Sequence, residues 1–321
     1  LQKITNEIVL KIVDHARKVY PSKNLCLAGG VALNCVTNGK ILEKNWFENI
    51  YIQPAAGDAG GAVVAALFVY FNGLRNTYPL QNGRTMETVY LGPEYSDAEI
   101  ENFLNKEVKE IIGENNKVVY TKLSSDEVIS KVSDLITGNN VVGLFGGRME
   151  YGPRSLGNRS IIADARNKEN WQKVNLKIKF RESFRPFAPT VLEDKLAECF
   201  DIKVPSSYML LVASVRRTDV PAITHVDNSA RIQSVNREQN QRYYDIIKAF
   251  YEKTGCPVII NTSFNVRGEP IVMSPKDAFN TFLNTFMDYL VLGNYLISKK
   301  DNEGLVDNEK MTEYLGKFKL D

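Results

Sequence analysis

The first 73 residues alternate between helical and extended hydrophobic patterns. Apolar side chains recur three or four positions apart near the start, which predicts an amphipathic helix. In order, the predicted elements are a helix over 4–19, a buried strand over 25–28, a helix over 31–43, a strand over 49–53 and a helix over 60–71. The last helix is almost entirely apolar, so we expect it to be buried. This order predicts half of a doubly wound α/β domain.

The rest of the chain mixes helices and strands less regularly. The predicted helices cover 96–105, 124–136, 168–178, 238–252 and 275–286, and the predicted strands cover 141–145, 188–192, 209–215 and 258–261. Strands outnumber what a simple βαβ alternation requires, so we expect an α+β domain over 91–300. A segment rich in Asn, Pro and Gly, 74–90, is the predicted linker. Residues 301–321 form a polar tail with one weak helix over 308–318.

Composition narrows the class of protein. The chain has 321 residues, and its 40 basic and 38 acidic residues leave a net charge of +2. This balance argues against nucleic-acid binding, which usually requires a basic domain. The longest apolar run, 60–71, is too short to cross a bilayer, so we expect no membrane segment. The four cysteines form no CxxC pair, and we expect reduced thiols in a cytoplasmic protein. Because the chain begins at Leu1, inside a helix, we expect it to be a piece of a longer protein.

Positive charge concentrates between Arg148 and Arg185. This segment contains ten basic and four acidic residues, a net charge of +6, which leaves −4 for the rest of the chain. The arginines alternate with glycine, proline and aromatic residues, whereas a solvated helical face would show Glu/Lys pairs four residues apart. Guanidinium groups beside exposed backbone amides suit small phosphates. A basic surface loop held by ion pairs is the alternative.

A second cluster of polar side chains directly follows the apolar run 257–260. It starts at Asn261 and includes Ser263 and Asn265, which are small hydrogen-bonding residues and poor core material. Such residues at the end of a buried strand could orient a ligand, although a turn with local side-chain caps is the alternative. His225 forms a third candidate, because Asp227 and Arg231 are close to it in a loop.

Two glycine-rich turns in the first 73 residues each follow a strand and open a helix. Gly29 and Gly30 precede Asn34, and Gly57 and Gly60 flank Asp58. Glycine lets a ligand approach the backbone, and a helix N-terminus offers free amides to an anion. Many α/β domains use such turns only for packing. Asp58 could be a helix N-cap, a metal ligand, or both.

Several of these motifs together resemble one known family. They are Gly29–Asn34, Gln53–Ala62, Met149–Ser160, Phe184–Pro189, His225–Asp227, Arg231–Val235 and Asn261–Asn265, and they occur in the expected order. They are similar to the O-carbamoyltransferases of the nodulation and antibiotic type (NodU, TobZ and cephamycin carbamoyltransferases). The resemblance covers about residues 20–300. It implies a Kae1-like domain of the actin-like ATPase superfamily, of which only the C-terminal half is present over 1–73, and a YrdC-like twisted open sheet over 91–300.

The resemblance also implies an activity. The YrdC-like domain would use ATP, with Mg²⁺ expected from the chemistry, to convert carbamoyl phosphate into carbamoyl adenylate. The Kae1-like domain would pass the carbamoyl group to an acceptor hydroxyl beside Fe²⁺, with Asp58 as a metal ligand. The partner histidines of an HxxxH-like motif are absent, so we expect this chain to lack iron and transfer activity. The acceptor stays open, and a homodimer is compatible with the family.

The residues and the resemblance together predict one site for two polyanions. The predicted phosphate side consists of Arg148, Arg154, Arg159, Lys179, Arg181 and Arg185, and the opposite side consists of His225, Arg231, Asn261, Ser263 and Asn265. Among these, Arg148, Arg154, Arg159, Arg185 and His225 are the predicted catalytic residues. Two other functions stay open: a threonylcarbamoyl-adenylate synthase of tRNA modification, and a nucleotide-binding remnant without catalysis.

Overall fold

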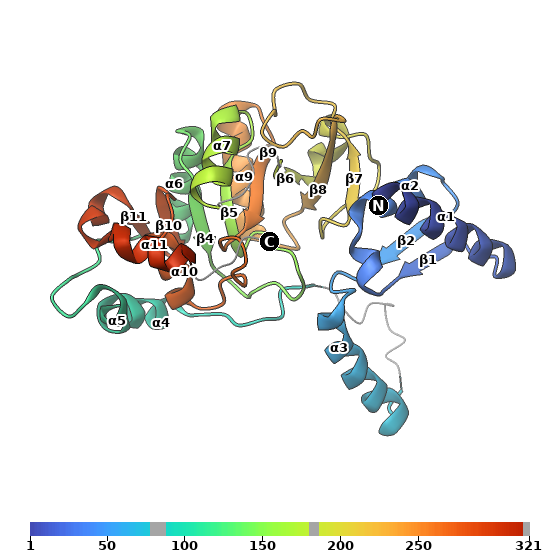
Figure 1. Ribbon diagram of the computed structural model, residues 1–321, viewed down its shortest axis with the longest axis horizontal. Coiled ribbons are helices and arrows are strands. Elements are labelled where there is room, and N and C mark those ends of the chain that lie inside the picture. Colours follow the sequence, from blue (N-terminus) through green and yellow to red (C-terminus); the bar gives the residue numbers. More distant parts are fainter. Residues whose placement is uncertain (78–87, 180–185, 317–321) are drawn as a thin grey trace.

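The computed structural model describes residues 1–77, 88–179 and 186–316. These residues form a two-stranded sheet and a nine-stranded sheet (Figure 1). The mixture of parallel and antiparallel pairs in the large sheet, with helices on both faces, confirms the α/β and α+β prediction. None of the helices in this part of the chain combines the length and the apolar character needed to span a membrane.

The N-terminal unit is built around the small parallel sheet. Its elements are α1 (Gln2–Val19), β1 (Asn24–Leu27), a 3-10 turn (Gly30–Leu33), α2 (Cys35–Glu43), β2 (Asn49–Ile52), α3 (Asp58–Phe68) and a π-helical turn (Val69–Gly73). The prediction of one continuous helix over 31–43 was wrong. Asn34 has an extended ψ of 89° and caps α2, because its side chain accepts a hydrogen bond from the Thr37 amide at 3.2 Å.

Two burial predictions for this unit were also wrong. Helix α3 extends away from both sheets (Figure 1), and apolar side chains such as Val64 and Phe68 are 64% and 65% exposed. The strand predicted over 25–28 is not buried, since Cys26 in β1 and Ala28 after it are exposed and Leu25 and Leu27 are only partly buried. Apolar composition predicted burial, but in this structure no described element covers the outer side of α3 or β1.

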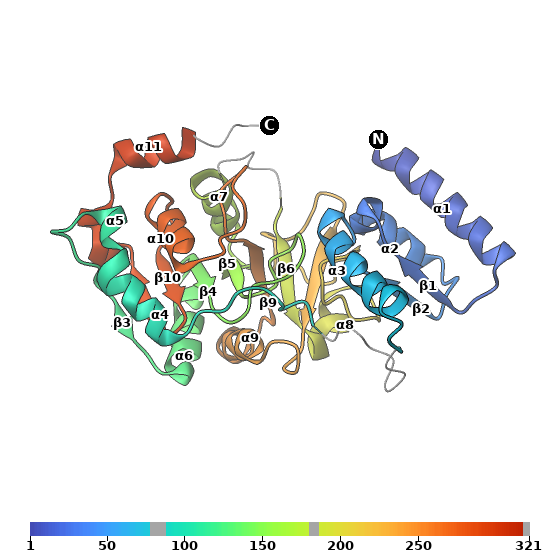
Figure 2. The same cartoon turned by 90° about the horizontal axis from the view of Figure 1, so that it is seen from below.

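The large sheet has the strand order β3-β11-β10-β4-β5-β9-β6-β8-β7. Its strands are β3 (Thr121–Lys122), β4 (Val142–Phe145), β5 (Arg159–Asp164), β6 (Ala188–Leu192), β7 (Leu211–Ser214), β8 (Ser229–Val235), β9 (Val258–Ser263), β10 (Tyr289–Leu292) and β11 (Tyr295–Ser298). Its helices are α4 (Asp97–Asn102), α5 (Lys109–Ile112), α6 (Ser125–Thr137), α7 (Lys168–Lys177), α8 (Leu196–Cys199), α9 (Gln241–Thr254), α10 (Pro275–Leu283) and α11 (Asn308–Gly316). Short 3-10 or π turns follow at Phe103–Glu107, Glu193–Lys195 and Lys300–Leu305. Figure 2 shows α6 and α9 on one face of the sheet and α7 and α10 on the other.

The sequence patterns missed β3, β5, β8, β10 and β11. Strand β5 is fully buried in the middle of the sheet, so it lacks the alternation that marks a half-buried strand. It also begins with Arg159 and Ser160, so its first residues were assigned to the basic segment that precedes it. Strands β10 and β11 form a hairpin whose two-residue turn is Gly293-Asn294, with a positive φ of 53° at Gly293.

The two units pack together through α2 and the edge strand β7. A side chain at Gly39 would place its Cβ 2.6 Å from the Val212 carbonyl oxygen, so only glycine allows this approach. The buried Asn38 side chain donates hydrogen bonds to the carbonyl oxygens of Ala32 and Leu210, at 2.8 and 3.0 Å. The N-terminal unit therefore sits directly beside the β7 end of the large sheet.

Candidate functional site

A cavity of about 560 Å³ lies where the two units meet. This main cavity is lined by α2 along its length, the loop before β5, the start of β6, the end of β9, and parts of β7 and β8. Its polar lining includes Cys35, Lys40, Glu43, Arg154, Ser155, Ser214, His225, Asp227, Ser229, Arg231, Asn261, Thr262 and Ser263, and its apolar lining includes Val36, Phe187, Met209 and Val212. A volume of this size, with a few convergent polar groups, is typical of small-molecule sites.

The main cavity contains polar atoms whose hydrogen-bonding capacity is unused. Arg154 Nε, Ser155 Oγ and Asn261 Oδ1 are all buried and have no hydrogen-bond partner among the described residues. Such groups are rare in folded proteins because each costs about 1–3 kcal/mol. Burial also lowers the pKa of the Arg154 guanidinium, because the charge has lost its water. Three such atoms belong to residues that line one cavity, which makes this cavity the candidate site for a polar ligand.

Asn261 is held in place by a buried network behind the cavity wall. Its amide nitrogen donates hydrogen bonds to Gln233 Oε1 at 2.7 Å, Thr190 Oγ1 at 3.2 Å and the Ser155 carbonyl at 3.3 Å. Strand register explains the meeting, because Asn261 on β9 pairs with Ala188 on β6, and Thr190 on β6 pairs with Gln233 on β8. The network fixes the Asn261 side chain in the cavity wall, where its Oδ1 atom has no partner among the described residues.

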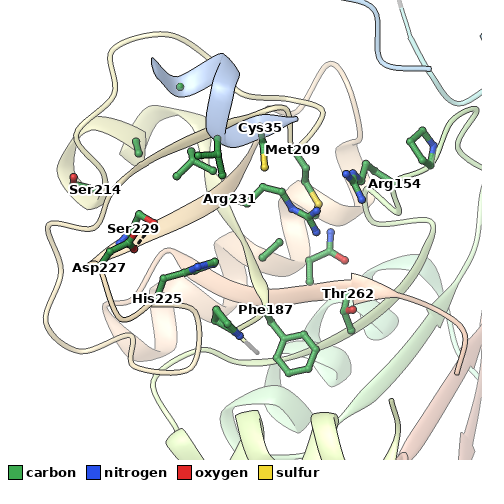
Figure 3. A pocket seen from close by; sticks show the side chains of 18 of the residues that line it. Cys35, Arg154, Phe187, Met209, Ser214, His225, Asp227, Ser229, Arg231 and Thr262 are labelled. Atoms are coloured by element: carbon green, nitrogen blue, oxygen red, sulfur yellow. Dashed lines mark hydrogen bonds between the residues drawn. The ribbon is translucent and has the colours of Figure 1, made fainter. Parts of the chain in front are cut away.

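Histidine and arginine lie on the other side of the cavity. Figure 3 shows Arg231, from β8, and Arg154, from the loop before β5, extending into the same space, with His225 on a neighbouring loop. Burial lowers the pKa of His225, the nearby Asp227 carboxylate raises it, and the Arg231 charge lowers it. The net effect keeps more of the imidazole neutral near pH 7 than in a free histidine. A neutral imidazole can accept a proton from a bound reactant.

Lys179 organises the loop that follows β9. Its buried ammonium group donates hydrogen bonds to Ser263 Oγ at 3.2 Å and to both the backbone carbonyl and the side-chain oxygen of Asn265 at 2.8 Å. Ser263 lines the cavity, whereas Lys179 and Asn265 lie behind it. These hydrogen bonds hold the segment from Ser263 to Asn265 at the edge of the cavity. They also place the ammonium group of Lys179 next to Ser263, which lines the cavity.

Two predicted phosphate ligands occupy other positions. The Arg148 side chain is 59% exposed, and its Nε lies 3.7 Å from a carboxylate oxygen of Glu94. Arg159 is 0% exposed, and its guanidinium donates to four backbone carbonyls and stacks on the Phe145 ring. The four carbonyls belong to Pro93, Gly146, Gly147 and Asn158. Neither position agrees with the predicted phosphate contact. Arg181 and Arg185 lie outside the described residues.

The glycine turns of the N-terminal unit do not line the main cavity. Gly29 and Gly30 are exposed, whereas Gly60 is a packing glycine, because a Cβ there would lie 2.2 Å from the Ala55 carbonyl oxygen. Gly57 precedes α3, and Asp58 is exposed in its first turn. The parallel pairing of β1 and β2 brings the two turns to one edge of the small sheet. Asn34 acts as the cap of α2.

These residues do not fit an iron site. Within the described ranges, no group of three or more His, Cys, Asp or Glu side chains is close enough to hold a metal ion. A transition metal generally needs at least three protein ligands in fixed geometry. We therefore derive no chemical step from a metal at Asp58.

Sequence patterns missed several residues of the site. Ser155 and Thr262 are direct neighbours of predicted ligands, so their position beside Arg154 and Asn261 could have indicated them. Cys35 directly follows the first glycine turn and comes from the N-terminal unit. No local signal pointed to Thr190 or Gln233, because their role depends on strand pairing.

Comparison with known proteins identifies two family domains in the chain. Residues 1–67 match the carbamoyltransferase N-terminus and residues 133–299 match the carbamoyltransferase C-terminus. An uncharacterised protein of Synechocystis is 46% identical over 100% of this chain and 54% of its own length. The nodulation protein NolNO of Sinorhizobium fredii is 42% identical over 94% of this chain and 43% of its own length. NolO of Bradyrhizobium diazoefficiens is 40% identical over 94% of this chain and 54% of its own length.

The chain spans about half the length of these relatives. Among solved structures, full-length HypF in its phosphate- and nucleotide-bound form aligns with a TM-score of 0.39 and 13% identity, over 77% of this chain and 36% of HypF. That likeness is too weak to support an argument about the site. The match to both family domains and the identity to the nodulation proteins confirm the resemblance seen in the sequence: the chain belongs to the carbamoyltransferase family.

Proposed function

We propose that this chain is the activating part of an ATP-dependent O-carbamoyltransferase and that the main cavity binds ATP and carbamoyl phosphate. The observation that carries the proposal is the set of unpaired buried polar atoms on Arg154, Ser155 and Asn261, beside Arg231 and His225. Two arginines and several hydrogen-bonding groups around one cavity suit a multiply charged ligand. Family membership supplies the carbamoyl chemistry.

The proposed reaction has two balanced steps. Water first splits carbamoyl phosphate into carbamate and inorganic phosphate. A carbamate oxygen then attacks the α-phosphorus of ATP, the bond to the β-phosphate breaks, and pyrophosphate leaves carbamoyl adenylate behind. In a complete enzyme, an acceptor hydroxyl would attack the carbamoyl carbon and release AMP. A requirement for Mg²⁺, a homodimer and a cytoplasmic location remain predictions.

The residues of the cavity would act by charge and position. Arg154 and Arg231 would hold phosphate oxygens and stabilise the negative charge that develops at phosphorus. Neutral His225 would accept the proton from the attacking water. Ser155 and Asn261 would orient the bound reactants through hydrogen bonds, which places the reacting atoms together.

Pyrophosphate release tests the proposal directly. The full chain should release pyrophosphate from ATP only when carbamoyl phosphate is present. Arg154→Ala should lower this rate by roughly a hundredfold or more, as for the loss of one preorganised donor. Arg154→Lys should restore only part of it, since an ammonium group does not reproduce a guanidinium fork. Arg237→Ala is the matched control, because that arginine is exposed and outside the cavity.

The same assay separates the other functions. Pyrophosphate release with threonine and bicarbonate in place of carbamoyl phosphate would identify a threonylcarbamoyl-adenylate synthase. ATP binding without release under either condition would identify a nucleotide-binding remnant. Release at equal rate from ATP alone would contradict the assignment.

A further inference from the structure

Arg154 lies on a loop that is longer than most hairpin loops. The loop joins the antiparallel neighbours β4 and β5 and covers residues 146–158. Hairpin loops usually have two to five residues, and longer ones tend to adopt several conformations. A phosphate ligand on such a loop needs other residues to fix it, because ordering a mobile group on binding costs affinity.

Glu150 closes the loop from the inside. Its side chain is buried, and its Oε1 atom accepts hydrogen bonds from the backbone amides of Leu156 at 2.6 Å, Asn158 at 2.9 Å and Arg159 at 3.3 Å. One carboxylate oxygen thus joins the beginning of the loop to its end. The hydrogen bonds to these amides offset part of the cost of burying the carboxylate, and burial still raises the pKa of Glu150. The segment 151–155, which carries Arg154, is left as a short closed loop.

Tyr151 fixes this short loop from the outside. Its hydroxyl donates a hydrogen bond to the backbone carbonyl of Ala59, in the first turn of α3. Gly152, with a φ of 131°, lies against the same part of the N-terminal unit, since a Cβ there would be 3.3 Å from the Pro54 carbonyl oxygen and 3.5 Å from Ala55 Cβ. The loop is therefore attached to the large sheet through Glu150 and to the N-terminal unit through Tyr151.

We propose that Glu150 and Tyr151 are positioning residues that hold Arg154 in the main cavity. The inference rests on the proposed function, because it assumes that Arg154 binds a phosphate group of the nucleotide. Glu150 holds the two ends of the short loop 151–155 together. Tyr151 attaches this short loop to residues 54–59 of the N-terminal unit. Nucleotide binding therefore depends on the N-terminal unit even though Arg154 belongs to the other one.

A double-mutant cycle on the full chain tests this role. ATP binding is measured by calorimetry for Glu150→Gln, Tyr151→Phe, Arg154→Ala and the two double variants. Glu150→Gln should weaken ATP binding about tenfold and Tyr151→Phe several-fold, in the range of coupling between neighbouring residues. In the Arg154→Ala background, neither change should weaken binding further, because there is no guanidinium left to position. The matched controls are Glu114→Gln and Tyr120→Phe, which change polar groups outside the cavity and should bind ATP like the parent.

Amide hydrogen exchange of the ligand-free protein gives a second readout. Glu150→Gln should speed exchange at Leu156 and Asn158, and Tyr151→Phe should speed exchange within 152–155, while the melting temperature stays within a few degrees of the parent. A purely structural role would lower the melting temperature and leave the effects on ATP binding additive. If Glu150→Gln does not fold, Tyr151→Phe carries the test, since it removes only one hydroxyl.

The outcomes separate the two proposals. If Glu150→Gln and Tyr151→Phe weaken ATP binding equally with and without Arg154, the positioning role is overturned while the proposed function stands. If Arg154→Ala binds ATP as tightly as the parent, the proposed function is overturned. Unchanged amide exchange in both variants would overturn the positioning role by itself.

Discussion

Replacing Arg159 should damage stability rather than nucleotide contact. The side chain is 0% exposed, donates hydrogen bonds of 3.0–3.1 Å to four backbone carbonyls, and lies 3.8 Å from the centre of the Phe145 ring. Burial lowers its pKa to about 10, and the nearby Glu150 carboxylate partly opposes this shift. The guanidinium is therefore charged at neutral pH and serves as the internal scaffold of the loop before β5.

The magnitude follows from these contacts. A hydrogen bond from a charged group contributes about 1.5–3 kcal/mol, but the four share one guanidinium and are not additive. Removing one partner from a buried charged arrangement typically costs about 3–5 kcal/mol. We expect Arg159→Ala to lower the free energy of unfolding by about that amount. Arg159→Lys should cost about half as much, because an ammonium group cannot reach four carbonyls in one plane.

Urea denaturation followed by circular dichroism measures this loss, with Arg237→Ala as the exposed control. At a temperature where Arg159→Lys is fully folded, its affinity for ATP should fall by much less than that of Arg154→Ala. The reasoning would be refuted by a lysine variant as stable as the parent that no longer binds ATP. That result would place Arg159 among the phosphate ligands after all.

Two further results are expected. The imidazole of His225 can be followed by NMR, since the chain has only 2 histidines and His15→Gln assigns the other signal. Arg231→Gln should raise the pKa of His225, because it removes a like charge, and Asp227→Asn should lower this pKa, because it removes an opposite charge. Shifts in the opposite directions would show that other groups control the pKa of the imidazole. With Arg231→Gln, the acid limb of pyrophosphate release should move to higher pH, because His225 becomes protonated earlier as pH falls. Gly60→Ala should lower the free energy of unfolding by about 1–3 kcal/mol, because its Cβ would clash with the backbone, and a thermal melt equal to the parent's would contradict the packing role.

Local sequence patterns predicted an element well where the segment itself carries the signals for its ends and its buried face. The helices α6, α9 and α10 begin with polar caps and carry an apolar stripe, so their positions could be predicted closely. The strand β6 was predicted with its bounds, because a short apolar run between turn residues has few other readings. The equally buried strand β5 was missed because it begins with Arg159 and Ser160 and ends at Asp164, so its apolar run is shorter.

The sequence predicted which residues gather at the site, but it predicted only in part which way their side chains face. Arg154, His225, Arg231, Asn261 and Ser263 were predicted from clustered polar residues, and all five line one cavity. Sequence could not distinguish an arginine that faces the cavity from one that faces inward. Arg159 turns toward backbone carbonyls because it begins a buried strand, and that fact depends on the partners of the strand.

The strand order of the large sheet has a consequence for how the chain folds. Strand β3, at residues 121–122, pairs with β11, at residues 295–298, and β4 pairs with β10, where Val142 lies opposite Tyr289. This side of the sheet therefore closes only after Ser298, the last residue of β11, has been synthesised. Contacts so distant in sequence slow folding, because chain entropy is lost before they form. We expect the carboxyl-terminal hairpin to act as the last step of assembly, so that nascent chains lacking it expose unpaired strand edges and depend on chaperones to avoid aggregation.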